Sequence, residues 1–96
     1  MPEQKPQLDK FAIAAALQEI AQLMDLRGGQ SRFKAKAYNA GARSIQAVND
    51  LDRLVREDQL TMLPRIGGAL ASQIKQLYLT GESSVLNDLR KEFPRG

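Results

Sequence analysis

The residues best suited to do chemistry in this sequence are cations and backbone amides. Five basic side chains lie in a stretch that has no acidic residue between positions 27 and 48, namely Arg27, Arg32, Lys34, Lys36 and Arg43. Further along, a turn containing proline and glycine at residues 64–68 leads into an apolar helical pattern. The first N–H groups of a helix lack an internal acceptor, and with the positive end of the helix dipole they suit a phosphate. Both features indicate a surface that binds a polyanion.

The composition excludes several other kinds of chemistry. The 96 residues include no cysteine and no histidine, and 14 Lys and Arg against 11 Asp and Glu give a net charge of +3. Disulfides, thiolate nucleophiles and the usual zinc ligands are therefore missing, and the length corresponds to one domain. No apolar run approaches the roughly 20 residues of a membrane helix, and the N-terminus is too polar for a signal peptide. We expect no membrane partner and a cytoplasmic protein, associated with the nucleoid if it is bacterial.

Apolar periodicity predicts an all-α, compact bundle of four to five short helices. Residues 1–8 are expected to be a disordered lead-in, and residues 9–96 a single domain. The first helix is expected to follow an N-cap at Asp9 and to end at Gly28-Gly29. The second is expected to run from Ser31 or Arg32 to Val48, with Ser31 as a cap. Its expected apolar face consists of Phe33, Ala37, Gly41, Ser44, Ile45 and Val48.

Four shorter elements are expected to follow. Leu51, Leu54 and Val55 indicate a short third helix, and residues 60–63 a helical turn that stops before Pro64. The next helix buries Leu70, Ala71, Ile74, Leu77 and Tyr78 and closes at Thr80-Gly81. Ser83 then caps a last helix that ends at Phe93-Pro94.

Within the second helix, Arg32, Lys36 and Arg43 fall in one polar stripe, whereas Lys34 lies on the other flank beside Tyr38. The stripe is either a solubilising surface or a set of phosphate contacts, and the shared side favours contact. Phe33 could stack on a base, but we expect it to pack in the core instead. Tyr38, at the edge of the apolar face, could do both.

The segment Leu60–Ile74 resembles a helix-hairpin-helix motif, with Leu63, Pro64, Ile66, Gly67, Ala71 and Ile74 at the motif's positions. The resemblance extends over about residues 11–96. It is to the N-terminal lyase-type domain of family X DNA polymerases, the family of polymerase beta and its bacterial relatives. Residues 13–23, 32–45 and 79–81 match the opening helix, the second helix and the end of the hairpin's second helix.

This resemblance implies sequence-nonspecific binding of gapped, nicked or 5′-phosphorylated DNA through the backbone, in DNA repair or as a polymerase accessory domain. Lys34 matches a phosphate-binding lysine and Tyr38 a pocket tyrosine. It also implies a monovalent cation, Na⁺ or K⁺, on the carbonyls of Thr61, Leu63 and Ile66, and no other cofactor. The expected DNA-binding residues are Arg32, Lys34, Lys36, Tyr38, Arg43, Arg65, Ile66, Gly67, Gly68, Ala69 and Gln73. The chain is either free-standing or an excised domain of a parent that carries a polymerase palm.

The sequence departs from the family pattern at the residues of the lyase chemistry. Some family members remove a 5′-deoxyribose phosphate through a lysine Schiff base, and Gln73 stands where that lysine is expected. Ala69 replaces a supporting lysine, and Lys75 projects to the other flank of the helix. We therefore expect no such activity, although whether the chain is an enzyme stays open. One alternative is a lyase that uses Lys34 or Lys36, and another is a protein-interaction module that has lost DNA binding.

Arg65 stands where the hairpin's first glycine is expected. If that position needs a positive φ, arginine costs about 1 kcal/mol or more. Its guanidinium could offset that cost by contacting a phosphate. The other possibility is a hairpin that has drifted away from DNA, and we favour contact.

Overall fold

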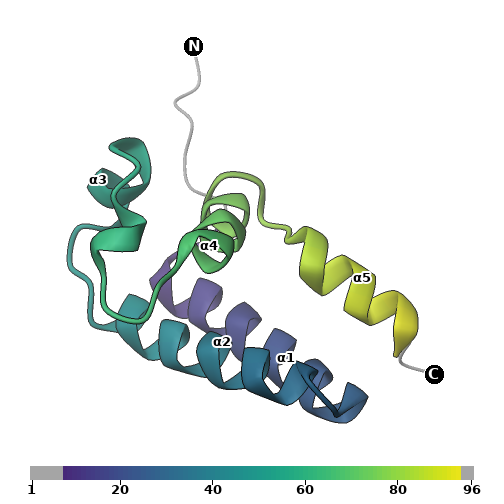
Figure 1. The fold of residues 1–96 in the computed structure, drawn as a ribbon. Helices are drawn as coiled ribbons and strands as arrows, with labels where there is room; N and C mark the ends of the chain where they lie inside the picture. Colours follow the sequence, from purple (N-terminus) through teal and green to yellow (C-terminus); the bar gives the residue numbers. More distant parts are fainter. Residues whose placement is uncertain (1–7, 94–96) are drawn as a thin grey trace.

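A computed structural model describes residues 8–93 of the chain and confirms an all-α bundle of the expected size (Figure 1). In this part of the chain there is no strand. Its elements are α1 (Lys10–Arg27), α2 (Ser31–Gln46), α3 (Leu51–Arg56), the 3₁₀ turn η1 (Leu60–Met62), α4 (Gly68–Thr80) and α5 (Ser84–Glu92). The expected lead-in covers residues 1–8. Of these, 1–7 lie outside the described residues, and Leu8 packs partly buried against the core.

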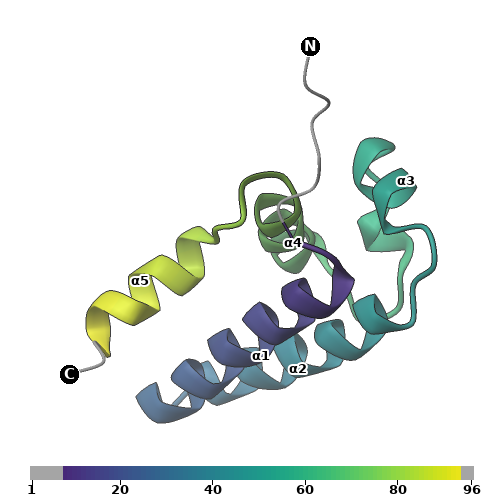
Figure 2. The same ribbon diagram turned by 180° about the vertical axis from the view of Figure 1, so that it is seen from behind.

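Helix α1 begins and ends where its sequence predicts. The Asp9 carboxylate accepts a hydrogen bond of 2.8 Å from the N–H of Ala12, and Gly28 ends the helix at a φ of 77°, which favours glycine. Six apolar residues recur at helical spacing along it and are all buried, namely Ile13, Ala14, Leu17, Ile20, Ala21 and Met24. Because the connection to α2 is short, the two helices form an antiparallel pair, seen from both sides in Figures 1 and 2.

Helix α2 begins at Ser31, as predicted, but it differs from its prediction in its N-cap, its C-terminal end and its buried face. Ser31 lies inside the helix instead of capping it, since Gln30 is the N-cap and its side chain makes no cap hydrogen bond. The helix ends at Gln46, two residues before the predicted end. The buried residues are Ala35, Tyr38, Gly41, Ala42 and Ile45. Small side chains on this face allow the neighbouring helices to approach closely.

The prediction that Phe33 packs in the core is wrong. Its side chain is 73% exposed. Phe33 lies in the first turn of α2, and the buried face of the helix begins two residues later, at Ala35. The aromatic ring is therefore left on the surface next to Lys34.

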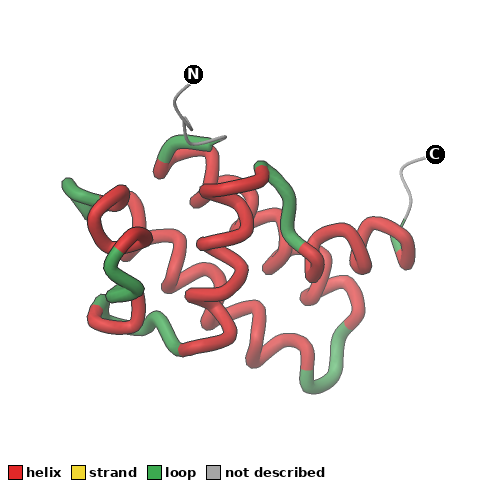
Figure 3. The backbone as a smooth tube through the Cα atoms, turned by 90° about the horizontal axis from the view of Figure 1, so that it is seen from above, coloured by secondary structure: helices red, strands yellow, loops and turns green. Residues whose placement is uncertain are grey.

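Helix α4 crosses the α1–α2 pair and fills the centre of the bundle (Figure 3). Its Ile74 and Leu77 are fully buried in one core cluster that includes Leu17 and Ile45. At the crossing, α2 has Gly41, where an added Cβ would overlap Leu70 Cδ2. The glycine therefore sets how closely α4, and the hairpin that precedes it, can approach α2.

Polar contacts attach the remaining helices. The Tyr78 hydroxyl donates a 2.6 Å hydrogen bond to Asp52 and so connects α4 with α3. Arg90 binds the Glu19 carboxylate through two hydrogen bonds of 2.9 Å, which holds α5 against α1. Because this ion pair lies at the surface, we expect it to contribute at most about 1 kcal/mol.

Candidate nucleic-acid interface

The hairpin that joins η1 to α4 is a well-formed turn fixed by backbone hydrogen bonds. The N–H of Leu63 donates to the carbonyl of Leu60 at 3.1 Å, and the N–H of Ile66 donates to that of Leu63 at 3.3 Å. The Ile66 side chain is only 4% exposed. The turn therefore anchors itself through Ile66, and the residues that follow, Gly67 and Gly68, lie on the surface.

Backbone N–H groups at the start of α4 have no acceptor among the described residues. Gly67 is the N-cap and supplies no side chain, and the first N–H of this region with a protein acceptor is that of Ala71, bonded to the Gly67 carbonyl at 2.9 Å. Gly67, Gly68 and Ala69 are all exposed. Three amides at the positive end of a 13-residue helix are thus open to an anion.

The fold does not require glycine at position 67 or at position 68. Neither has a positive φ, and a Cβ added at either position would meet nothing within 4 Å. The space that a side chain would take at these two positions is open, so its absence leaves the backbone accessible to close approach by an external group. This is the geometry that a phosphate contact requires.

Arg65 adopts the backbone conformation expected of the glycine it replaces. Its φ is +67°, which confirms that the position is left-handed and costs an arginine about 1 kcal/mol. The side chain is exposed and makes no ion pair within residues 8–93. The guanidinium is therefore available at the corner of the hairpin, two residues before the open amides.

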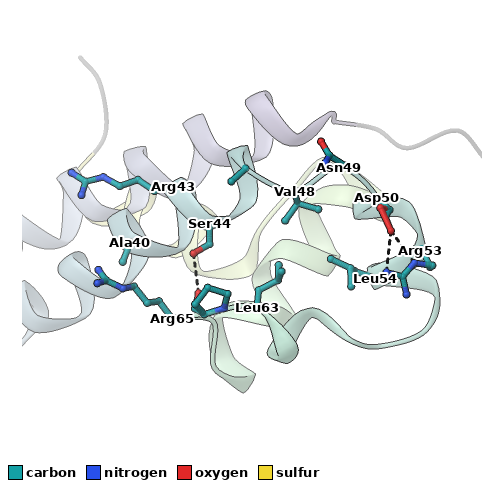
Figure 4. A pocket seen from close by; sticks show the side chains of 12 residues that line it. Ala40, Arg43, Ser44, Val48, Asn49, Asp50, Arg53, Leu54, Leu63 and Arg65 are labelled. Atoms are coloured by element: carbon teal, nitrogen blue, oxygen red, sulfur yellow. Dashed lines mark hydrogen bonds and ion pairs between the residues drawn. The ribbon is translucent and has the colours of Figure 1, made fainter.

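A side-chain contact fixes the hairpin against α2. The Ser44 hydroxyl donates a 2.8 Å hydrogen bond to the Pro64 carbonyl (Figure 4). On the same side of α2, Arg43 lines a pocket together with Pro64 and Arg65. The last part of the basic segment is thus brought next to the hairpin, although about 20 residues separate them in the sequence.

The basic residues of α2 lie on two sides of the helix, as predicted. At about 100° per residue, Lys34 is only about 20° from Gly41 and so lies on the side of α2 that meets α4. The stripe of Arg32, Lys36 and Arg43 lies more than about 140° from Gly41. All four side chains are exposed. Lys34 therefore lies on the α4 side of α2, and the stripe lies on the opposite side of that helix.

Tyr38 and Gln73 are both largely buried, and they differ in whether a polar atom stays accessible. Burial raises the pKa of Tyr38, yet its hydroxyl reaches solvent, because no buried polar side-chain atom lacks a partner in the described part of the chain. Gln73 is 7% exposed, and its carbonyl oxygen accepts a 2.5 Å hydrogen bond from the Ser83 hydroxyl. The expectation that Gln73 faces DNA does not fit this burial, since its amide is committed to the start of α5.

Of the three carbonyl oxygens expected to hold a monovalent cation, two accept no backbone hydrogen bond from the described residues. The carbonyl of Thr61 lacks the donor that a continuing turn would supply, because residue 64 is proline and has no N–H. The carbonyl of Ile66 likewise accepts no backbone hydrogen bond from the described residues, and that of Leu63 accepts one from Ile66. These are neutral oxygen ligands of the kind that bind K⁺ and Na⁺.

Two residues of the site escaped the sequence analysis. Phe33 was expected in the core, and its position among three basic residues in the first turn of α2 was the available signal. Asn49, which lines the same pocket as Arg43, follows the predicted end of the helix and carries no sequence signal.

None of the described helices has the length and apolar character to cross a bilayer, and residues 8–93 contain no group of side chains that would hold a divalent metal.

The fold and the open hairpin amides define a helix-hairpin-helix module. A family model described as "Helix-hairpin-helix domain" matches residues 9–83, and the chain belongs to this family. It is also 34% identical over 89 residues to "DNA polymerase/3'-5' exonuclease PolX" of Bacillus subtilis (strain 168), a match that covers 93% of this chain and 15% of that protein. Both findings confirm the resemblance to the helix-hairpin-helix domain of family X polymerases. No solved structure matches the chain significantly.

Proposed function

We propose that this domain binds DNA through its backbone phosphates, without base specificity, as the helix-hairpin-helix module of a family X polymerase. The observation that carries the proposal is the set of open amides at Gly67, Gly68 and Ala69, which are exposed and have no acceptor among the described residues. Phosphate oxygens accept hydrogen bonds from such amides whatever the base. The polymerase context rests on a relative of which the chain spans about 15% of the length.

The preferred DNA in this proposal has a gap, a nick or a 5′-phosphate end. Lys34 projects on the α4 side of α2 with the Tyr38 hydroxyl one helical turn away, and together they suit a terminal phosphate. The exposed ring of Phe33, next to Lys34, suits stacking on an unpaired base at the gap. Arg32, Lys36 and Arg43 on the other flank suit the continuing duplex.

The monovalent cation belongs to the same proposal. Thr61, Leu63 and Ile66 would hold Na⁺ or K⁺ through their carbonyl oxygens. A cation bound there adds positive charge to the hairpin, next to the open amides. We therefore expect DNA affinity to be higher in NaCl or KCl than in a bulky organic cation at the same ionic strength.

We further propose that the domain lacks the Schiff-base lyase activity. Gln73 carries a carboxamide, whose nitrogen is not nucleophilic, and its Oε1 and Nε2 contact Ser83 and Ser84. Borohydride trapping on a nicked abasic duplex tests this. No covalent adduct is expected, whereas an adduct lost in Lys34→Ala or Lys36→Ala would establish the alternative of a lyase with a surrogate lysine.

The binding proposal is tested by fluorescence anisotropy with a labelled duplex that carries a one-nucleotide gap and a 5′-phosphate. Lys34→Ala should weaken binding roughly tenfold, since a charge-assisted phosphate contact contributes about 1.5–3 kcal/mol, and should reduce the salt dependence by about one counterion. Lys75→Ala is the matched control, because Lys75 is also an exposed lysine but belongs to α4 and is not one of the assigned DNA-binding residues. If neither Lys34→Ala nor Arg65→Glu weakens binding, the assigned surface is wrong and a protein-interaction module is favoured.

A further inference from the structure

A pocket of about 610 Å³ lies beside the hairpin, between the second half of α2, the α2–α3 loop and the turn at residues 63–65 (Figure 4). Its floor is apolar and includes Val48, Leu54 and Leu63. Helix-hairpin-helix contacts to a phosphate backbone do not need an apolar hollow. The proposed function therefore leaves this feature unexplained.

The charged side chains around the pocket are unequally satisfied. At one end, Arg53 is paired with Asp50 at 3.0 Å and with Glu57 at 3.6 Å. At the other end, Arg43 and Arg65 have no acidic partner among the described residues (Figure 4). An occupant should therefore have an anionic group at the end with the two unpaired arginines.

The polar edge of the pocket offers one uncommitted amide. Asn49 lines the pocket and is exposed, and its side chain makes no hydrogen bond within the described residues. An amide can donate and accept at once, as it does against the edge of a nucleobase. The apolar floor, the free amide and the two arginines without an acidic partner together match a planar heterocycle that carries a phosphate.

We propose that this pocket binds one unpaired nucleotide of the DNA strand held by the hairpin, with its base on the apolar floor and its phosphate between Arg43 and Arg65. This inference rests on the proposed function. Pro64 and Arg65 form the rim of the pocket and lead directly to the open amides of Gly67 and Gly68. A strand bound at those amides therefore passes the mouth of the pocket. The volume lies within the range of pockets that hold small ligands.

The test compares a fully paired duplex with the same duplex carrying one unpaired 2-aminopurine nucleotide. The native chain should bind the second DNA about tenfold more tightly, the order of magnitude for burying one aromatic ring against apolar side chains, and the fluorescence of the probe should change on binding. Ala40→Leu fills the pocket from a helical, half-buried position. It should abolish both the preference and the fluorescence change while leaving affinity for the paired duplex intact.

Arg43→Ala against Arg32→Ala is the matched charge control, because both arginines lie in one stripe of α2 and only Arg43 lines the pocket. Arg43→Ala should weaken binding of the DNA with the unpaired nucleotide more than binding of the paired duplex and so reduce the preference, whereas Arg32→Ala should weaken both DNAs equally. An unchanged preference in Ala40→Leu overturns the pocket assignment while duplex binding, and with it the proposed function, stands. The pocket assignment would also be overturned if the native chain bound an acidic peptide and Ala40→Leu abolished that binding without changing the affinity for either DNA. If neither DNA binds the native chain, the proposed function itself fails.

Discussion

The Gln73 side-chain carbonyl accepts a 2.5 Å hydrogen bond from the Ser83 hydroxyl, and both residues are buried. Ser83 in turn caps α5 by accepting a 3.2 Å hydrogen bond from the N–H of Leu86. At the position where the family resemblance implies a catalytic lysine, this chain therefore has a structural residue that connects α4 to the start of α5.

Gln73→Ala should lower the free energy of unfolding by about 1–3 kcal/mol, because it leaves the buried Ser83 hydroxyl without its acceptor. Urea denaturation measures this loss. Gln76→Ala is the control, since Gln76 makes a similar contact to the N–H of Ser84 at 2.8 Å but at the exposed edge, and it should cost less. Equal effects of the two changes would contradict the role assigned to Gln73.

Arg65→Gly should separate stability from DNA binding. The position has a φ of +67°, so glycine relieves a strain of about 1 kcal/mol and the variant should be more stable by about that amount. It should also bind DNA several-fold more weakly, because the guanidinium is lost. Arg65→Ala should show the weaker binding with no gain in stability. If Arg65→Gly binds DNA as well as the native chain, the arginine is not a phosphate contact.

Gly41→Ala should destabilise the fold although alanine is the better helix former. The added methyl group overlaps Leu70, and overpacking costs about 1–3 kcal/mol against a gain of about 1 kcal/mol in helix propensity. In a Leu70→Ala background the same change should become stabilising, because the overlap is gone. A double-mutant cycle by thermal or chemical denaturation checks the change of sign, and additive effects would contradict the proposed contact.

The Tyr78–Asp52 hydrogen bond should make stability depend on pH at both extremes. Burial, followed by the bond to Asp52, raises the pKa of Tyr78 from 10.0 to about 12. The contribution of the Tyr78 hydroxyl to the free energy of unfolding is therefore complete below pH 10 and is lost as pH rises toward 12. The bond from Tyr78, followed by that from Arg56, lowers the pKa of Asp52 below 3.8, so that contribution is lost as pH falls below this value. The stability difference between the native chain and Tyr78→Phe should be constant between these limits and shrink outside them.

The helices could be predicted from sequence where local signals determine them. Asp9 and Ser83 begin α1 and α5 because their side chains accept hydrogen bonds from N–H groups of the first turn. Gly28 ends α1 because glycine adopts the positive φ of that position without strain. The buried face of α2 could not be predicted in this way. It depends on Leu70, which lies 29 positions away and fits only against a glycine. The expected face included the large apolar side chain of Phe33, which lies on the solvent side of α2.

The site was predicted in part for the same reason. The hairpin turn and the left-handed Arg65 follow from proline and glycine positions in a local motif. The pairing of Ser44 with Pro64 and that of Gln73 with Ser83 join residues 20 and 10 positions apart. Such contacts depend on how the helices pack, and no local pattern in the sequence encodes them.

The central claim is that the N–H groups of Gly67, Gly68 and Ala69 donate to DNA phosphates. An ¹⁵N–¹H correlation spectrum of the labelled chain, titrated with the gapped 5′-phosphorylated duplex, tests it most directly. These three amides should shift downfield, saturate together with the anisotropy signal and return toward their free positions as salt is added. If they stay in place while the DNA is demonstrably bound, the strand lies elsewhere on the molecule and the account is contradicted.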